Sequence, residues 1–99
     1  MFIRRTTYRL APDFDTPDGQ AQFEGEMRAN IRPENIEGLI STSHVPNEDG
    51  SWTVVAVWET KVNAMAAVGR IREEWDRQAS RLVEGPLIET AGIGIWEAG

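Results

Sequence analysis

The chain has 99 residues, 40% hydrophobic and 26% charged, and its ten basic and sixteen acidic side chains give a net charge of -6. This charge would repel nucleic-acid phosphates, no stretch approaches the roughly 18 apolar residues that cross a bilayer, and zero cysteines exclude disulfides and thiolate metal sites. We therefore expect one domain spanning residues 1–99, with no nucleic-acid or membrane partner. Because the opening Met-Phe-Ile-Arg-Arg lacks an apolar signal segment, the expected location is cytoplasmic.

The N-terminal third predicts a strand and then a helix. Residues 2–10 are rich in aromatic and β-branched types and stop at an Ala-Pro step, as a strand does. Thr16 followed by Pro17 is a typical N-cap and first helical residue, so a helix is expected from residue 17. Pro33 ends it. Within this helix, apolar residues recur every four positions in an otherwise polar sequence and predict one buried stripe, formed by Phe23, Met27 and Ile31.

A β-hairpin is expected in the middle of the chain. Residues 39–46 alternate weakly and end in proline, which is typical of an edge strand, and regular alternation would place Leu39 on the side of Ser41, opposite His44. The polar turn 47–50 joins this strand to residues 51–60. That second strand is apolar on both faces, one carrying Trp52, Val54, Ala56 and Trp58 and the other Thr53, Val55 and Val57.

The C-terminal third predicts a long helix and a last strand. Thr60 can cap a helix that runs to about residue 83 and ends at Gly85-Pro86. Residues 87–97 would return as a strand in which Gly92 and Gly94 permit a bulge. The helix carries an apolar stripe at three- and four-residue spacing, made of Ala64, Val68, Ile71, Trp75, Ala79 and Leu82.

The order β-α-β-β-α-β predicts an α+β, ferredoxin-like fold. Right-handed crossovers place two helices on one face of a four-stranded antiparallel sheet whose first and third strands are central. The helix-free face of strand 51–60 would then leave an apolar patch larger than soluble monomers tolerate. We therefore expect a homodimer in which two sheets pack face to face as a dimeric α+β barrel. RNA-recognition domains share this order of elements, but their basic-aromatic strand motif is absent and the charge has the wrong sign.

Three short segments resemble the antibiotic-biosynthesis-monooxygenase-like (ABM-like) domains of the dimeric α+β barrel superfamily. They are the opening strand 2–10 with its Ala-Pro step, Ile36-Glu-Gly-Leu39, and Trp58-Glu-Thr60 entering the second helix. The resemblance covers nearly the whole chain and implies a homodimer with a pocket between sheet and helices in each subunit. It implies a small-molecule-binding protein, either a cofactor-independent monooxygenase or related enzyme acting on a small aromatic or polyketide-like substrate, or a non-catalytic metabolite-binding or regulatory module.

Few catalytic residues follow from the resemblance. The family's oxygenases resemble one another in an asparagine four residues before the tryptophan of strand three, and this chain has Val54 there. Haem-degrading members use a histidine in the second half of the chain, whereas the single histidine here is His44. Trp58 does match and would form a wall for a flat aromatic ligand. No bound cofactor is expected.

The candidate site residues each have a functional and a structural interpretation. His44 is the default general acid or base because its ordinary pKa lies near neutrality, although a surface or hydrogen-bonding role is commoner. Trp58, Trp52 and Tyr8 are candidate ligand contacts, with packing as the commoner role. One histidine and no cysteine predict no metal site.

Three arginines cluster on the first strand: Arg4, Arg5 and Arg9. At least one must point into an interior or an interface, where a guanidinium needs a carboxylate or a ligand anion. Pairing with Glu59 or Glu89 is the commoner outcome and substrate binding the alternative.

Overall fold

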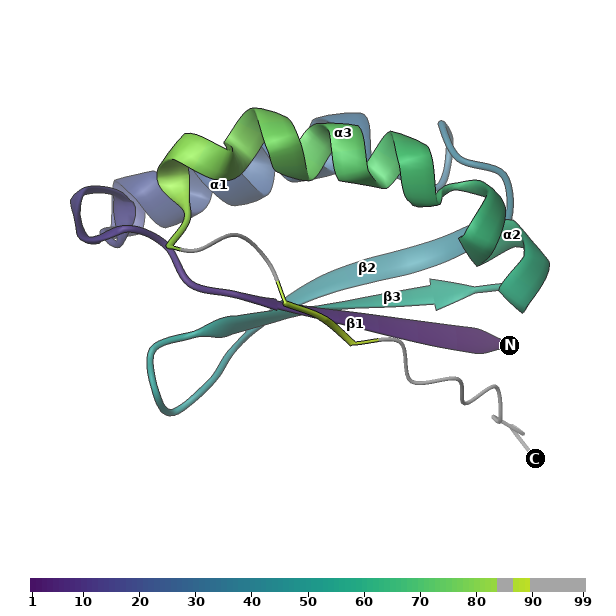
Figure 1. The fold of residues 1–99 in the computed structure, drawn as a ribbon, viewed down its shortest axis with the longest axis horizontal. Coiled ribbons are helices and arrows are strands. Elements are labelled where there is room, and N and C mark those ends of the chain that lie inside the picture. The colour runs from purple at the N-terminus through teal and green to yellow at the C-terminus, as the bar shows by residue number, and fades with distance from the viewer. Residues whose placement is uncertain (84–86, 90–99) are drawn as a thin grey trace.

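A four-stranded antiparallel sheet forms one layer of the molecule in a computed structural model that describes residues 1–83 and 87–89 (Figure 1). The strand order is β2-β3-β1-β4, so the prediction of central first and third strands and an edge second strand is confirmed. The predicted Gly85-Pro86 stop and the strand beyond Glu89, including Gly92 and Gly94, lie outside the described residues. The strands are β1 (Phe2–Tyr8), β2 (Leu39–Pro46), β3 (Trp52–Trp58) and β4 (Leu87–Glu89).

The helices form the second layer and all lie on one face of the sheet (Figure 1). After a 3-10 turn η1 (Pro12–Phe14), helix α1 (Pro17–Asn30) begins where the sequence predicted, because the Thr16 hydroxyl accepts a hydrogen bond from the Gly19 amide at 3.0 Å. The predicted stripe of Phe23, Met27 and Ile31 is buried against the sheet. The four-residue spacing of apolar side chains therefore predicted the buried face of α1 correctly.

The prediction of one helix from residue 60 to 83 was wrong. The segment comprises α2 (Lys61–Ala66), α3 (Val68–Gln78) and a 3-10 turn η2 (Ala79–Arg81). At Ala67, with φ -90° and ψ -5°, the amide donates to the carbonyl of Ala64 as well as that of Asn63, which tightens the turn and redirects the chain. The break lets the small Ala64 and Ala67 side chains pack inward on one side of it while Trp75 packs on the other.

Ala79 was also predicted wrongly, because it is exposed and the neighbouring Gln78 is buried instead. Gln78 Nε2 donates to Glu26 Oε1 at 3.2 Å and to Glu74 Oε2 at 3.1 Å, and Gln78 Oε1 accepts from Arg81 at 2.8 Å. These bonds satisfy the buried amide, so a polar residue takes the inward position that periodicity assigned to an apolar one.

A bulge in β2 places Leu39 on the opposite face of the sheet from the one predicted. The ladder pairs Leu39 with Trp58 but Ser41 with Val57, so one extra residue lies between them. Downstream, His44 pairs with Val54, on the helix-facing side of the sheet. Leu39 therefore shares the inner face with His44, and it is 5% exposed.

The two faces of β3 have different surroundings. The register pairs Phe2, Arg4, Thr6 and Tyr8 of β1 with Trp58, Ala56, Val54 and Trp52 of β3, and these pairs face the helices. Phe23 and Trp58 are the largest fully buried side chains of the core. The opposite face presents Ile3, Val55 and Val57, each partly exposed, and Val45 at 43% exposure. The two-faced pattern predicted for strand 51–60 is confirmed, and nothing among the described residues forms a layer on its second face.

Gly38 gives a first prediction, Gly38→Ala. With φ +81° this residue is in the left-handed region, and an added Cβ would lie 2.4 Å from the Cβ of Asn63. We expect Gly38→Ala to destabilise the fold by about 1–3 kcal/mol because strain and collision add. Gly25→Ala is the matched control: nothing lies within 4 Å of the new methyl in α1, so it should stabilise by about 0.5–1 kcal/mol. Urea unfolding measures both, and equal effects would contradict the backbone assignment at Gly38.

Candidate functional site

An aromatic cluster fills one end of the layer between sheet and helices. Tyr8 of β1 lies 4.8 Å from Phe23 of α1 and 5.5 Å from Trp75 of α3, measured between ring centroids. His44 of β2 meets Tyr8 and Phe23 edge-on at 6.0 and 6.2 Å. Residues that lie far apart in the sequence, on β1, α1, β2 and α3, thus meet in one cluster that includes His44.

Tyr8 and His44, the predicted donor and the predicted acid or base, are hydrogen bonded. The Tyr8 hydroxyl oxygen lies 3.1 Å from His44 Nδ1. Burial, and secondarily the charge of Glu24, raises the pKa of Tyr8, while burial lowers the pKa of His44. Both groups are therefore neutral at pH 7. If Tyr8 accepts from Nδ1, His44 Nε2 is the basic atom; if Tyr8 donates, Nε2 carries the proton.

The space beside His44 is small. A cavity of about 20 Å³ is bordered by His44 and Val54, the residue at the family's asparagine position, together with Met27, Arg28, Ile31 and Thr42. A volume of this size holds about one water molecule. A substrate would reach His44 only if α1 moved away from the sheet.

The His44 environment predicts a pH dependence. Because burial lowers its pKa in the folded state, the unfolded chain binds the proton more readily, so stability rises with pH between the folded pKa and the ordinary value of about 6.5. The contribution is present above pH of about 6.5 and is lost as the pH falls below it. His44→Gln should flatten this part of the profile of unfolding free energy against pH. An unchanged profile would contradict the assigned environment.

Trp58 and Trp52 occupy different surroundings on β3. Trp58, at the strand's end, has 0% exposure, and its indole Nε1 has no hydrogen-bond partner. Trp52 is partly exposed at the other end, opposite Tyr8 in the ladder. A fully buried N–H without an acceptor is uncommon, because an unpaired buried donor costs about 1–3 kcal/mol.

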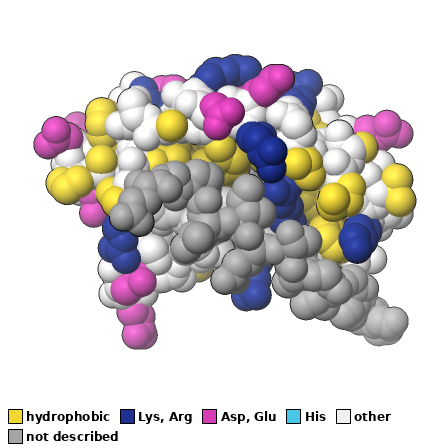
Figure 2. All heavy atoms as spheres, in the orientation of Figure 1, with side chains coloured by type: hydrophobic (Ala, Val, Ile, Leu, Met, Phe, Trp, Pro, Cys, Tyr) yellow, Lys and Arg dark blue, Asp and Glu magenta, His cyan; other side chains and the backbone are white. Residues whose placement is uncertain are grey.

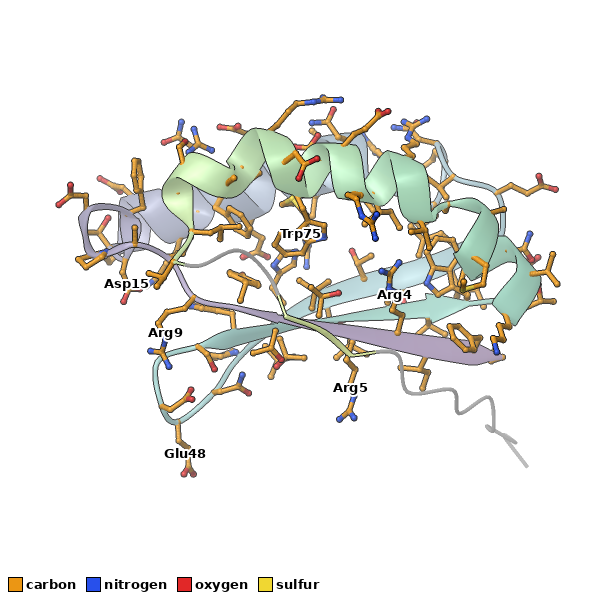
Figure 3. The ribbon with its side chains drawn as sticks, viewed as in Figure 1. Arg4, Arg5, Arg9, Asp15, Glu48 and Trp75 are labelled. Atoms are coloured by element: carbon orange, nitrogen blue, oxygen red, sulfur yellow. The ribbon has the colours of Figure 1, made fainter. Side chains whose placement is uncertain are left out.

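Arg4 and Arg5 of β1 point in different directions from each other and from Arg9, which follows the strand (Figure 3). Arg9 binds Asp49, with 3.3 Å between Nη2 and Oδ2, and Arg5 extends from the helix-free face. Arg4 rises toward the helices, is 9% exposed, and its Nη1 has no hydrogen-bond partner. No ion pair of Arg4 or Arg9 with Glu59 is found among the described residues, and the Glu89 side chain lies outside the description.

Sequence reasoning missed a polar network between α1 and α3. Arg81 Nη1 lies 3.0 Å from Glu26 Oε2, and Arg77 Nη1 lies 3.2 Å from Glu74 Oε1. Gln78 of α3 and Arg81 of η2 both contact Glu26 and so link α1 to the C-terminal helices, whereas the Arg77–Glu74 pair lies within α3. The sequence signal that could have predicted this network is the spacing of Glu74 and Gln78, which lie four residues apart beside the apolar stripe of the helix. Within the described ranges, no group of three or more metal-ligating side chains gathers, and no helix is long and apolar enough to cross a bilayer.

The chain is similar to solved structures throughout its length. A protein from Nitrosomonas europaea superimposes with a TM-score of 0.73 at 14% identity, over 99% of this chain and 93% of that one. Proteins from Bordetella bronchiseptica (TM-score 0.66, 16% identity, 96% and 100% covered) and Deinococcus radiodurans (TM-score 0.65, 11% identity, all of both chains covered) also superimpose. All three are named provisionally as antibiotic biosynthesis monooxygenases. No family model and no curated protein matches the chain.

These likenesses establish the fold. The chain has the α+β fold of ABM-like domains, as the three resembling segments predicted. At identities of 11–16% the shared architecture carries no reaction with it.

Proposed function

We propose that the chain binds a small, flat, largely apolar molecule between its sheet and helices, against Trp58. The observation that carries the proposal is the buried Trp58 indole N–H without an acceptor. A carbonyl or other oxygen on a ligand would satisfy this donor while the indole face packs on the ligand's ring. Apolar layers between helices and sheet are also a common location of ligand sites.

The test is a titration followed by ¹H–¹⁵N NMR with a library of quinones, anthrones and phenolic acids. We expect the Trp58 indole signal to move with at least one compound. Trp58→Phe keeps an aromatic ring but removes the N–H, and it should weaken the binding of that compound by about fivefold, the value of one net hydrogen bond of about 1 kcal/mol. Trp52→Phe is the control and should leave affinity unchanged. No shift with any compound would overturn the proposal.

Catalysis is the second candidate, favoured by the Tyr8–His44 pair at 3.1 Å. In this version the protein is a cofactor-independent monooxygenase or a related enzyme, and His44 Nε2 takes a proton from the substrate while Tyr8 holds the ring. The one-water cavity beside His44 and Val54 at the asparagine position favour the non-catalytic binding module. Tyr8→Phe with His44→Ala distinguishes the two: an enzyme would lose turnover and keep affinity, whereas a binding module has no turnover to lose.

The assembly that fits the proposed function is a homodimer formed through the helix-free face. Ile3, Val55 and Val57 form a row of apolar side chains there, next to Val45. Covering such a row is favourable at about 25 cal/mol per Å² of apolar surface. Sedimentation at micromolar concentration tests it, and Val55→Lys should convert a dimer to monomers. A folded 11 kDa particle of the unmodified chain would contradict the dimer.

A further inference from the structure

Arg4 is a buried cation that the described part of the chain does not neutralise. Its side chain is 9% exposed, on the inner face of a central strand, and its Nη1 has no hydrogen-bond partner. The acidic partners of Arg9, Arg77 and Arg81 form no ion pair with Arg4. A buried charge without a partner is strongly unfavourable, so its retention calls for an anion.

The charge that shifts the pKa of Arg4 has the same sign. Burial lowers the pKa of Arg4, and the positive charge of Arg72 on α3 lowers it further. Figure 2 shows basic side chains reaching from the helix layer into the space above the sheet, with hydrophobic side chains on both sides. Arg4 on β1 and the exposed Arg72 on α3 are thus two like charges that act on each other in a chain whose net charge is -6.

Arg4 and Trp58 lie close enough to share one ligand. Arg4 pairs with Ala56, and Trp58 is two residues further along β3, so the two are diagonal neighbours on the same face, about 7–8 Å apart at the backbone. Long side chains reach across that spacing. The two donors without a partner among the described residues, Arg4 Nη1 and Trp58 Nε1, therefore belong to neighbouring side chains on the inner face, beside their ladder partners Ala56 and Phe2.

These donors select the chemistry of the ligand. A planar guanidinium matches the two oxygens of a carboxylate, and the apolar surroundings match a hydrocarbon body. A polyphosphate would bring several charges into a region that offers apolar walls and a net acidic molecule. We propose that the ligand is an aromatic or similarly apolar monocarboxylate, with its carboxylate on Arg4, supported by Arg72, and within reach of the Trp58 N–H. This inference rests on the proposed binding site and adds the charge of its occupant.

The experiment compares an acid with its uncharged amide. Wild-type protein is titrated by calorimetry or NMR at pH 7 with 2-naphthoate and 2-naphthamide, and with 4-hydroxybenzoate and 4-hydroxybenzamide. We expect the acid of at least one pair to bind at least tenfold more tightly than its amide. Arg4→Met, which keeps the length of the side chain without its charge, should abolish that preference. Arg9→Met, one residue beyond the end of the same strand, exposed and paired with Asp49, should keep it.

The outcomes separate the two proposals. Equal binding of acid and amide, or an acid preference that survives in Arg4→Met, would overturn the monocarboxylate and leave the binding site intact. Binding of neither the acids nor the amides, together with no shift in the wider compound library, would overturn both. The ligand-free melting temperature gives a second measurement: Arg4→Met should melt at a higher temperature than wild type, because an unpaired buried charge is removed. A variant that melts lower, or does not fold, would mean that Arg4 is already paired in the free protein, and would overturn the inference.

Discussion

Replacing Trp58 by alanine is expected to lower the free energy of unfolding by about 3–5 kcal/mol, the range for removing a fully buried aromatic side chain. Trp58 has 0% exposure and occupies the end of β3, where Phe2 and Leu39 are its partners in the sheet. Losing the indole therefore opens a cavity against two neighbouring strands. Urea unfolding measures the change, and thermal unfolding should shift by about 4–8 °C for each kcal/mol.

Trp52→Ala is the matched control for Trp58→Ala. It removes the same side chain from the same face of the same strand, but Trp52 is only partly buried. Its effect should be about half as large, because the hydrophobic contribution follows the area removed from water. Equal losses for the two variants would contradict the difference in burial between Trp58 and Trp52.

Phe23→Ala is the second large effect that we expect, at about 3–5 kcal/mol. Phe23 is fully buried and its ring is the part of α1 that meets Tyr8 and Trp75. Its removal should also admit water to His44, whose ring lies 6.2 Å away, so the lowered pKa of His44 should move back toward its ordinary value. An NMR titration of the His44 ring protons measures that shift.

A double-mutant cycle makes the Phe23 prediction sharper. Phe23 and Trp75 lie 5.9 Å apart between centroids, so their two alanine substitutions should not be additive. Phe14→Ala combined with Phe23→Ala is the control pair, and its losses should be additive. Phe14 is partly exposed beside Arg81 and lies outside the cluster. Additive losses for Phe23 and Trp75 would show that the aromatic cluster does not act as one packed unit.

The elements and their inner faces were predictable because each depends on short-range periodicity. Four-residue spacing identified the inner face of α1, and two-residue alternation identified the two faces of β3. The break at Ala67 was not predictable, since alanine suits a continuous helix and no glycine or proline marks the position. The prediction of the sheet face on which Leu39 lies was wrong for another reason. A bulge changes the alternation of a strand, and no sequence signal marks it when that alternation is weak.

The candidate site was predictable as single residues but not as a set. Alternation placed Tyr8 and Arg4 on the same side of β1, and one arginine was expected to point inward. The contact between Tyr8 and His44 joins residues 36 positions apart and depends on the register of two ladders. That the described residues offer the Arg4 Nη1 no hydrogen-bond partner depends on where their acidic side chains end, which no local pattern encodes.

The short connection between β3 and α2 ties the buried Trp58 to the molecular surface. Thr60, two residues after Trp58, accepts a hydrogen bond from the Asn63 amide at 3.1 Å and donates one to Asn63 Oδ1 at 2.6 Å, and the Asn63 side chain in turn fills the space above Gly38. Substitutions at Thr60 or Asn63 should therefore disturb the end of β3 that carries the buried indole. The packing of this interior tryptophan is thus set in part at the rim of the domain.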